Sequence, residues 1–457
     1  MHRFRSLRYE FRPMFNLAVP VVMAELGWMT MGIVDTLMVG RLSPEAIGAV
    51  GIGTSLFMGV VVLAMGVLLG LDTLVSHAYG AGHLEECHRW LFHGTTLAVI
   101  VTLPLTLILW ALLDSLDRFG FDPAVLDLTR PYLKVVTWSV LPLLLYAAFR
   151  RYLQGMGIAA PVMIALIVAN ITNVFFNWVL IFGNLGAPAL GVVGAAWATV
   201  GSRVAMAVFL LAVILIRESG LRPGLFETPL RIELGWMRQL LALGLPAALQ
   251  ITLEVGVFAA ATALAGRLLP ASLAAHQIAL NIAAFTFMVP YGVSSAGAVR
   301  VGHAVGRRDP PAASRAGWTA LLFGVGFMAI AAFVFTTIPE LLIGAFTQDE
   351  HVLAVGVSLL GVAAVFQLFD GLQAVATGIL RGLGDTRTPM LWNLAGHWFI
   401  GLPLGYSLCF AAGLGVLGLW WGLSTGLIIC GVSLLFVWYR RIHALNESFQ
   451  LPVASSR

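Results

Sequence analysis

The sequence LLALGLPAALQITLEVGVFAAATALAG, residues 240–266, is apolar along almost its whole length and carries a single carboxylate, Glu254. A helix needs about 20 such residues to cross the hydrocarbon core of a bilayer. Inside lipid every backbone polar group must be bonded within the structure, which a helix achieves and an open strand does not. The segment therefore predicts a transmembrane helix with a carboxylate at membrane depth.

Eleven further segments have the same apolar character. They lie near 14–39, 48–71, 91–113, 132–152, 161–182, 190–216, 273–298, 316–338, 353–377, 389–412 and 415–439. The whole chain is 59% hydrophobic and 11% charged, whereas soluble proteins carry about 25% charged residues. We therefore predict an all-α integral membrane protein with 12 transmembrane helices, for which lipid is the main solvent.

The basic residues predict the orientation, because Lys and Arg accumulate on the cytoplasmic side of a membrane. Twenty of them fall on the face that holds both termini and the even-numbered connections, and five fall on the other face. Both termini are therefore expected in the cytoplasm, with the protein in a bacterial-type inner membrane. The arginines lie in short loops between spans, so the net charge of +4 does not indicate a nucleic-acid partner.

The two halves of the chain resemble each other at a nearly constant offset. Pro20 of the first half matches Pro246 of the second, and the same offset relates GRL at 40–42 to GRL at 266–268 and His77 to His303. Two further matches follow in order: GxGxxxP at 155–161 with a longer copy at 382–389, and GVVGAAW at 191–197 with GVLGLWW at 415–421. Each half has an even number of spans, so the repeats are parallel and related by a pseudo-twofold axis along the membrane normal. We predict two six-helix lobes, residues 1–220 and 221–457.

Polar residues inside the spans are the candidates for function. A charge at mid-bilayer costs about 2.5–3.5 kcal/mol, yet four carboxylates fall there: Glu25, Asp35, Glu254 and Asp370. Amides and hydroxyls accompany them at helical spacing: Asn173, Asn177, Thr199, Gln250, Gln277, Asn281, Gln367 and Gln373. Such oxygen-rich clusters suit a hard cation such as Na⁺, and burial also favours the neutral, protonated carboxyl. The alternative interpretation of each amide is ordinary hydrogen bonding between helices.

At these residues the sequence resembles the multidrug and toxic compound extrusion (MATE) family, and its bacterial NorM-like branch in particular. The resemblance runs from about Leu17 to Val437. The strings that carry it are VDTLMVGRL at 34–42, YGAG at 79–82, LEVGVFAAATALAG at 253–266, AAHQIALN at 274–281, VRVGHAVG at 299–306 and FDGLQAVATGILRGLGDTRTP at 369–389. It implies a V-shaped molecule that exports organic cations by Na⁺ or H⁺ antiport, through alternating access of two lobes.

The resemblance also implies roles for individual residues. In the C-terminal lobe it implies a cation-coupling site at Glu254 and Asp370, near which we expect Gln277 or Asn281. In the N-terminal lobe it implies a second site, with possible Na⁺ binding, formed by Asp35, Asn173, Asn177 and Thr199. Some members carry an aspartate where this chain has Asn177, which leaves open which lobe and which ion perform the coupling. Pro20 matches a proline at which some members bend, and is the expected hinge.

Glu25, Gln250, Gln367 and Gln373 are the remaining candidates, as residues of a substrate cleft. The expected partners are small organic cations and the lipid bilayer, with a monomeric protein and no cofactor besides the coupling ion. The nearest alternative is a lipid-linked glycan flippase of the same superfamily, which the resemblance associates with arginines in the cavity; here only Arg203 is of that kind. An enzyme is not expected, because Asp114, Asp117, Asp122 and Asp127 lie in an outside loop rather than in a Mg²⁺-diphosphate motif.

Overall fold

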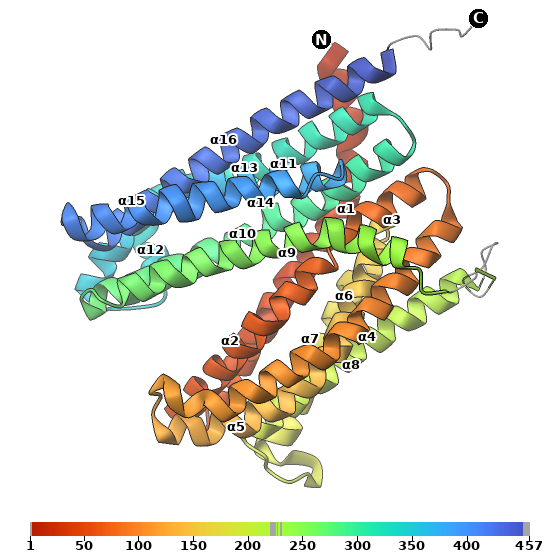
Figure 1. Ribbon diagram of the computed structural model, residues 1–457. Coiled ribbons are helices and arrows are strands. Elements are labelled where there is room, and N and C mark those ends of the chain that lie inside the picture. The colour runs from red at the N-terminus through yellow and green to blue at the C-terminus, as the bar shows by residue number, and fades with distance from the viewer. Residues whose placement is uncertain (1, 220–224, 226, 229–230, 451–457) are drawn as a thin grey trace, which may run out of the picture. The chain divides into compact units, whose positions relative to one another are not determined.

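The computed structural model describes residues 2–219, 225, 227–228 and 231–450 and folds them into helices joined by turns (Figure 1). Twelve helical segments of this described part are long and apolar enough to cross a membrane, which confirms the predicted number of spans. They are mostly longer than the apolar segments in the sequence. The longest helix has 38 residues, about 57 Å of helix, so its ends extend beyond the roughly 30 Å hydrocarbon core.

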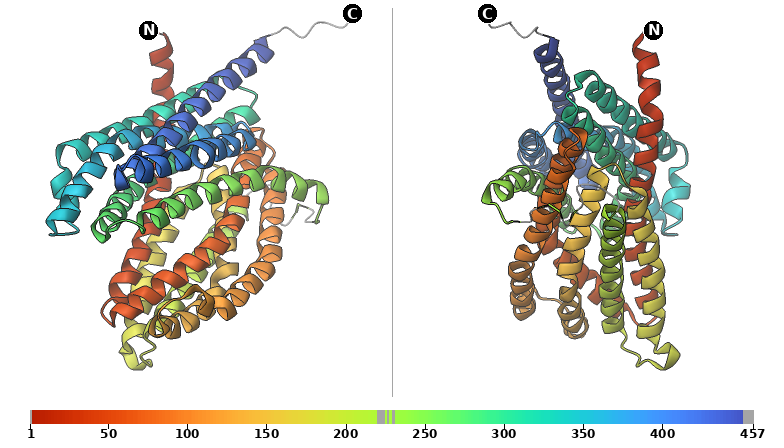
Figure 2. Two further views of the ribbon diagram at one scale, coloured as in Figure 1. Left: turned by 60° about the vertical axis from the view of Figure 1, so that its left-hand side comes forward. Right: turned by 90° about the vertical axis from the view of Figure 1, so that its right-hand side faces the viewer.

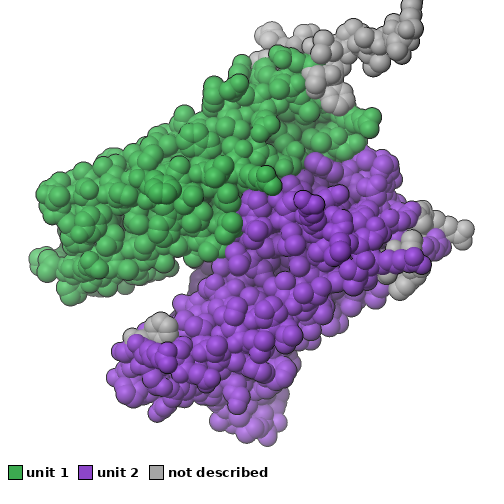
Figure 3. Space-filling model, in the orientation of Figure 1, with its two compact units in different colours: residues 1–22, 249–457 green, residues 23–248 purple. Residues whose placement is uncertain are grey.

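The chain divides into two compact units (Figure 3). We call residues 23–248 the N-terminal unit, and residues 1–22 with 249–457 the C-terminal unit. The predicted boundary at 220/221 lies outside the described residues. Two helices, α1 (His2–Val39) and α9 (Leu234–Ala265), each contribute to both units. The two division points, after Val22 and after Ala248, are related by the same offset as Pro20 and Pro246.

The N-terminal unit is a bundle of helices that run alongside one another (Figure 2). Besides parts of α1 and α9 it contains α2 (Pro44–Val67), α3 (Gly70–Gly80), α4 (Leu84–Ser115), η1 (Leu116–Phe119), α5 (Pro123–Val136), η2 (Thr137–Ser139), α6 (Val140–Gly155), α7 (Ala160–Phe182), η3 (Asn184–Gly186) and α8 (Val192–Glu218). α2 and α3 together form one span, as do α5 and α6. Phe57, Tyr132, Tyr146 and Tyr152 are fully buried in its core, where aromatic side chains each bury a large surface.

The C-terminal unit contains the start of α1 and the remaining spans. Its elements are the second part of α9, α10 (Pro270–Gly306), α11 (Pro310–Thr337), α12 (Pro339–Gly344), α13 (Glu350–Gly382), α14 (Arg387–Asn393), η4 (Leu394–Gly401), α15 (Leu402–Tyr406), η5 (Ser407–Ala411) and α16 (Gly415–Gln450). α14 to η5 form a single span in which η4 and η5 are π-helical. Phe335, Phe366 and Trp420 fill its core.

Helix starts follow the sequence closely. Ser43, Asp122 and Asp309 each accept a hydrogen bond from a backbone N–H of the following helix, at 2.8–3.2 Å. A proline follows each of these caps, where its missing N–H costs nothing because the first N–H groups of a helix have no partner in the helix. These caps place the turns between spans.

The internal repeat is visible in the backbone. Gly157 and Gly384, matched in sequence, have φ values of 80° and 89°. Gly82 has φ 82°, and its counterpart in the second half, Arg308, has φ 57° although it is not a glycine. Close helix contacts repeat as well: a methyl group at Gly66 would lie 2.5 Å from Cα of Ala248, and one at Gly292 would lie 2.9 Å from Cα of Val22. The offset that relates Pro20 to Pro246 also relates Gly66 to Gly292 and Val22 to Ala248.

Candidate functional site

The first polar cluster surrounds Asp35 in the N-terminal unit. Asn173 and Asn177 lie one turn apart on α7, and both amides donate to Oδ1 of Asp35, at 2.9 and 2.7 Å. The Thr199 hydroxyl of α8 lies 3.2 Å from the other carboxylate oxygen, Oδ2. All four side chains are buried. The structure thus brings together the four residues expected in the N-terminal lobe, from three different helices.

A buried arginine changes the charge of this cluster. Arg203 lies one turn beyond Thr199 on α8 and interacts electrostatically with Asp35. Its Nη1 donates to Oγ of Ser139 at 2.5 Å, and its guanidinium lies 4.5 Å from the centre of the Phe57 ring. With Asp35 ionised, the cluster is close to neutral before any cation arrives, so a bound Na⁺ would leave a net positive charge in low dielectric.

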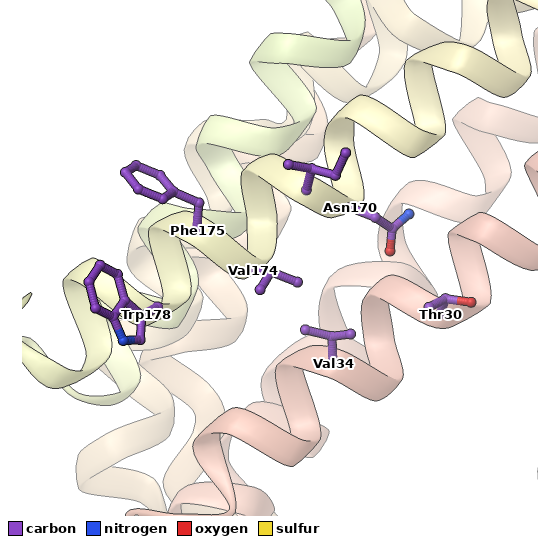
Figure 4. Close-up of a pocket in the computed structure, with 7 residues that line it drawn as sticks. Thr30, Val34, Asn170, Val174, Phe175 and Trp178 are labelled. Atoms are coloured by element: carbon purple, nitrogen blue, oxygen red, sulfur yellow. The ribbon is translucent and has the colours of Figure 1, made fainter.

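A groove lies beside this cluster on the surface of the N-terminal unit. Figure 4 shows Asn170 and Val174 of α7 pointing toward Thr30 and Val34 of α1. The groove has a volume of about 500 Å³, and its other walls are Ile171, Phe175 and Trp178. Asp35 does not line it. The amide of Asn170 is turned into the protein, where it donates to the Gly27 carbonyl at 2.9 Å, so the groove offers mainly apolar walls.

The second polar cluster lies in a cavity of the C-terminal unit. This cavity has a volume of about 390 Å³ and is bounded by α9, α10 and α13. Its polar lining consists of Gln250, Glu254, Tyr291, Ser294, Asp370, Gln373, Thr377 and Arg381. Aromatic and aliphatic side chains form the rest, including Phe258, Phe287 and Phe366. Ligand cavities of drug-sized molecules typically have about 300–1,000 Å³ and this mixture of apolar walls with a few polar groups.

Glu254 and Asp370 both line this cavity and interact electrostatically. Oε2 of Glu254 accepts hydrogen bonds from Gln250 at 3.2 Å and from Asn393 of α14 at 3.4 Å. Gln373 lies beside the same carboxylate, although neither of its amide atoms makes a hydrogen bond within the described residues. Two carboxylates in one buried cavity repel each other unless a proton or a cation lies between them.

The structure does not bring every expected residue to this cavity. Gln277 and Asn281 are exposed on α10 and do not line it. Gln277 shares a face with Ala284, which does, but lies two turns, or about 10 Å, nearer the helix start. The expectation that Gln277 or Asn281 lies near Glu254 and Asp370 in this cavity is therefore not met by the structure. Gln367 also lies elsewhere, since it donates to the Thr286 hydroxyl at 2.5 Å and holds α13 against α10.

Glu25 has a partner of its own. It forms a buried ion pair with Arg150 of α6, and the neighbouring Arg151 pairs with Asp72 of α3 at 3.2 Å. The side-chain oxygen Oε1 of Gln154 accepts from both arginines within 3.5 Å. Such paired charges are tolerated in a protein interior, whereas either partner alone is strongly destabilising. Glu25 therefore belongs to a structural charge network with Arg150 and Arg151, which the sequence placed at the cytoplasmic end of the fourth span.

Three groups near these clusters were not among the expected site residues. Asn393 and His397 lie one turn apart in the otherwise apolar eleventh span, a polar pair that the sequence displays. Arg203 is apparent in the sequence as a basic residue inside a span. The described residues contain no group of three or more His, Cys, Asp or Glu side chains that could hold a metal ion. The C-terminal cluster combines two carboxylates with amides and hydroxyls, whereas the N-terminal cluster combines one carboxylate with two amides, a hydroxyl and Arg203.

Twelve apolar spans and carboxylates held in the interior of two helical units define a polytopic membrane protein of the transporter class. A family model described as MatE matches residues 20–179 and 246–407. The chain is 38% identical over 441 residues to "Probable multidrug resistance protein NorM" of Mesorhizobium japonicum, covering 95% of this chain and 94% of the relative. It is 36% identical to "Multidrug resistance protein NorM" of Burkholderia vietnamiensis, with coverages of 95% and 94%. The chain belongs to the MATE family.

Solved structures agree on the fold. The chain matches the crystal structure of a MATE transporter in the bent conformation with a TM-score of 0.88 at 20% identity, covering 98% of this chain and 99% of that one. The eukaryotic MATE transporter AtDTX14 gives a TM-score of 0.85 at 20% identity, with coverages of 97% and 99%. The family consists of transporters rather than enzymes, so the expectation that this chain is not an enzyme is confirmed.

Proposed function

We propose that this protein is a multidrug efflux transporter that exports organic cations in exchange for Na⁺ or H⁺. The observation that carries the proposal is the cavity of the C-terminal unit, where Glu254 and Asp370 lie together among aromatic side chains. Aromatic faces and carboxylates attract lipophilic cations, and the same carboxylates attract a small ion. The names of the relatives, which describe multidrug resistance proteins, support the same substrate class.

Competition explains how such a site couples two flows. An organic cation and a coupling ion would each neutralise the Glu254–Asp370 pair, so binding of one weakens binding of the other. If the cavity opens alternately to the two sides of the membrane, as in alternating access, release of the ion on one side accompanies release of the drug on the other. In this proposal the protein acts as a monomer in an inner membrane, and the excess of arginines on one face supports an orientation with both termini in the cytoplasm.

We place the coupling ion in the C-terminal unit rather than at Asp35. The two oxygens of Asp35 already accept three hydrogen bonds, and Arg203 adds a positive charge that interacts with the same carboxylate. A cation at Asp35 would need the Asn173 and Asn177 amides to turn their carbonyls toward it. Among the described residues that line this cavity, Arg381 is the one cationic side chain, and it lies three turns, about 16 Å of helix, beyond Asp370.

The same charge balance bears on the alternative, a lipid-linked glycan flippase. Pyrophosphate carries negative charge and needs a basic cavity. The guanidinium of Arg203 is engaged by Ser139 and Phe57, and the cavity of the C-terminal unit holds two carboxylates against one arginine. These groups favour a cation over an anionic glycolipid.

The test is efflux of a fluorescent organic cation from inverted vesicles under imposed Na⁺ and H⁺ gradients, applied separately. We expect Glu254→Gln and Asp370→Asn each to reduce ion-driven transport by about tenfold or more. Asp35→Asn should reduce it less and leave the choice of ion unchanged. Glu350→Gln is the matched control, because Glu350 is an exposed carboxylate on the same helix as Asp370. Normal transport by both Glu254→Gln and Asp370→Asn would refute the proposed site.

A further inference from the structure

The eleventh span contacts α9 next to Glu254 through a π-helical segment. In η4 the backbone is widened relative to an α-helix, a rare feature that is frequently found at functional sites. Asn393, immediately before η4, donates to Glu254. Trp398, within η4, donates its indole N–H to the backbone carbonyl of Leu253 at 2.9 Å. The segment therefore holds both the carboxylate and the backbone beside it.

His397 lies between these two contacts and is fully buried. Its Nδ1 lies 3.2 Å from the backbone carbonyl oxygen of Asn393 and 3.2 Å from the side-chain Oδ1 of the same residue. A backbone carbonyl can only accept, so Nδ1 must carry the proton. The other nitrogen, Nε2, has no hydrogen-bond partner among the described residues.

This tautomer fixes the direction of the neighbouring amide. Because Nδ1–H of His397 donates to Oδ1 of Asn393, the NH₂ group of Asn393 must point the other way, toward Glu254. Donation then runs in one direction, from His397 to Asn393 to Glu254. If the amide were turned, a carbonyl oxygen would face the carboxylate and repel it.

We propose that His397 is a positioning residue that holds the Asn393 N–H on Glu254 and so sets how strongly the Glu254–Asp370 pair binds the coupling ion. The inference rests on the proposed function of that pair. His397 acts through Asn393 and touches neither carboxylate in the described structure. A purely structural histidine would instead cap the Asn393 carbonyl at the start of the π-helical segment, and would affect folding without affecting ion binding.

The experiment measures the concentration of Na⁺ or H⁺ that half-saturates efflux of a fluorescent cation such as ethidium from proteoliposomes. His397→Asn keeps an N–H near the position of Nδ1, whereas His397→Gln places its N–H near the position of Nε2. We expect His397→Gln to shift the half-saturating concentration by about tenfold, the effect of losing one hydrogen bond to a charged group. His397→Asn should remain close to the unmodified protein.

A double-mutant cycle with Asn393→Leu tests whether His397 acts through Asn393. In the Asn393→Leu background, His397→Gln should cause no further shift. Equal values for His397→Asn and His397→Gln, or an undiminished effect of His397→Gln in the Asn393→Leu background, would overturn the inference. Glu254→Gln separates the two hypotheses. If Glu254→Gln leaves ion dependence intact, the proposed function fails; if it removes ion dependence while His397→Gln behaves normally, only the role of His397 fails.

Discussion

Arg308 has a backbone conformation that side chains with a Cβ atom adopt at a cost. Its φ of 57° is left-handed, and the residue at the equivalent point of the first half, Gly82, avoids the cost because it has no Cβ. The conformation is needed at both points, since each ends a helix and is followed by a cap of the next. Arg308 is exposed and lies on the face expected to be cytoplasmic. Its positive charge therefore favours the predicted orientation in the membrane, although its backbone conformation is strained.

Replacing this residue should therefore stabilise the protein. The left-handed conformation costs a residue with a Cβ about 1–2 kcal/mol. Glycine avoids this cost but loses more chain entropy on folding, which offsets about 0.5–1 kcal/mol of the gain. We expect Arg308→Gly to raise the free energy of unfolding by about 0.5–1 kcal/mol. Thermal unfolding in detergent measures the change. Arg307→Gly, at the right-handed neighbouring position with φ −73°, is the control and should not stabilise.

At the residue scale the sequence predicted the Asp35 cluster better than the C-terminal one. Asn173 and Asn177 are one turn apart on a single helix, so their common face followed from spacing alone. Asn393 lies just before the π-helical segment of the eleventh span, and no spacing in the sequence relates it to Glu254 on α9. Arg150 falls at the end of the predicted span 132–152 and was counted only toward the orientation of the protein; its buried ion pair with Glu25 did not follow from any spacing in the sequence.

Glycines set how closely the helices of each unit approach. A methyl group added to Gly244 of α9 would lie 2.0 Å from the Val67 carbonyl oxygen, at the point where α2 gives way to α3. Between membrane helices, where lipid is as apolar as leucine, such close backbone contact is a main source of attraction. The contact joins the start of α9 to the second span of the first half.

A methyl group at Gly244 should push α9 away from the end of α2 and destabilise the N-terminal unit. We expect Gly244→Ala to lower the free energy of unfolding by about 1–3 kcal/mol, since the backbones must separate to admit the methyl group. Gly59→Ala is the matched control: Gly59 lies inside α2, and nothing stands within 4 Å of the added carbon. Unfolding in detergent, followed by tryptophan fluorescence, compares the two. A loss no larger at Gly244 than at Gly59 would contradict the close contact.

The elements were the most predictable scale. Twelve apolar segments of about 20 residues left little freedom in the number of spans, because hydropathy and length fix what can cross a bilayer. The turns were predictable where a proline follows Ser or Asp, as at Ser43 and Asp309. The break between α2 and α3 was not, because it interrupts an apolar segment that contains no proline at that point.

At the scale of the whole molecule, neither half of the sequence contains a complete unit. The start of the chain, as far as Val22, belongs with the second half, and the chain up to Ala248 belongs with the first. We expect fragments 1–220 and 221–457, expressed separately, to be degraded, because each lacks part of its own unit. Fragment 1–220 lacks the first part of α9, and fragment 221–457 lacks the start of α1. Expressed together, they should associate and restore cation efflux. Copurification through a tag on one fragment measures association, and a stable, monomeric fragment 1–220 would contradict the division into units.

The crossing of α1 and α9 between the units also bears on ancestry. A protein of half this length could form a homodimer in which the beginning of the first helix of each protomer packs in the bundle of the other protomer. Domain swapping of this kind is a low-cost route to a dimer. Duplication and fusion of such a gene would then join two subunits that already depended on each other, and later mutation could place an arginine where the other copy keeps glycine. In such a dimer, the Val22–Gly292 and Ala248–Gly66 contacts would have been the two equivalent contacts between the protomers.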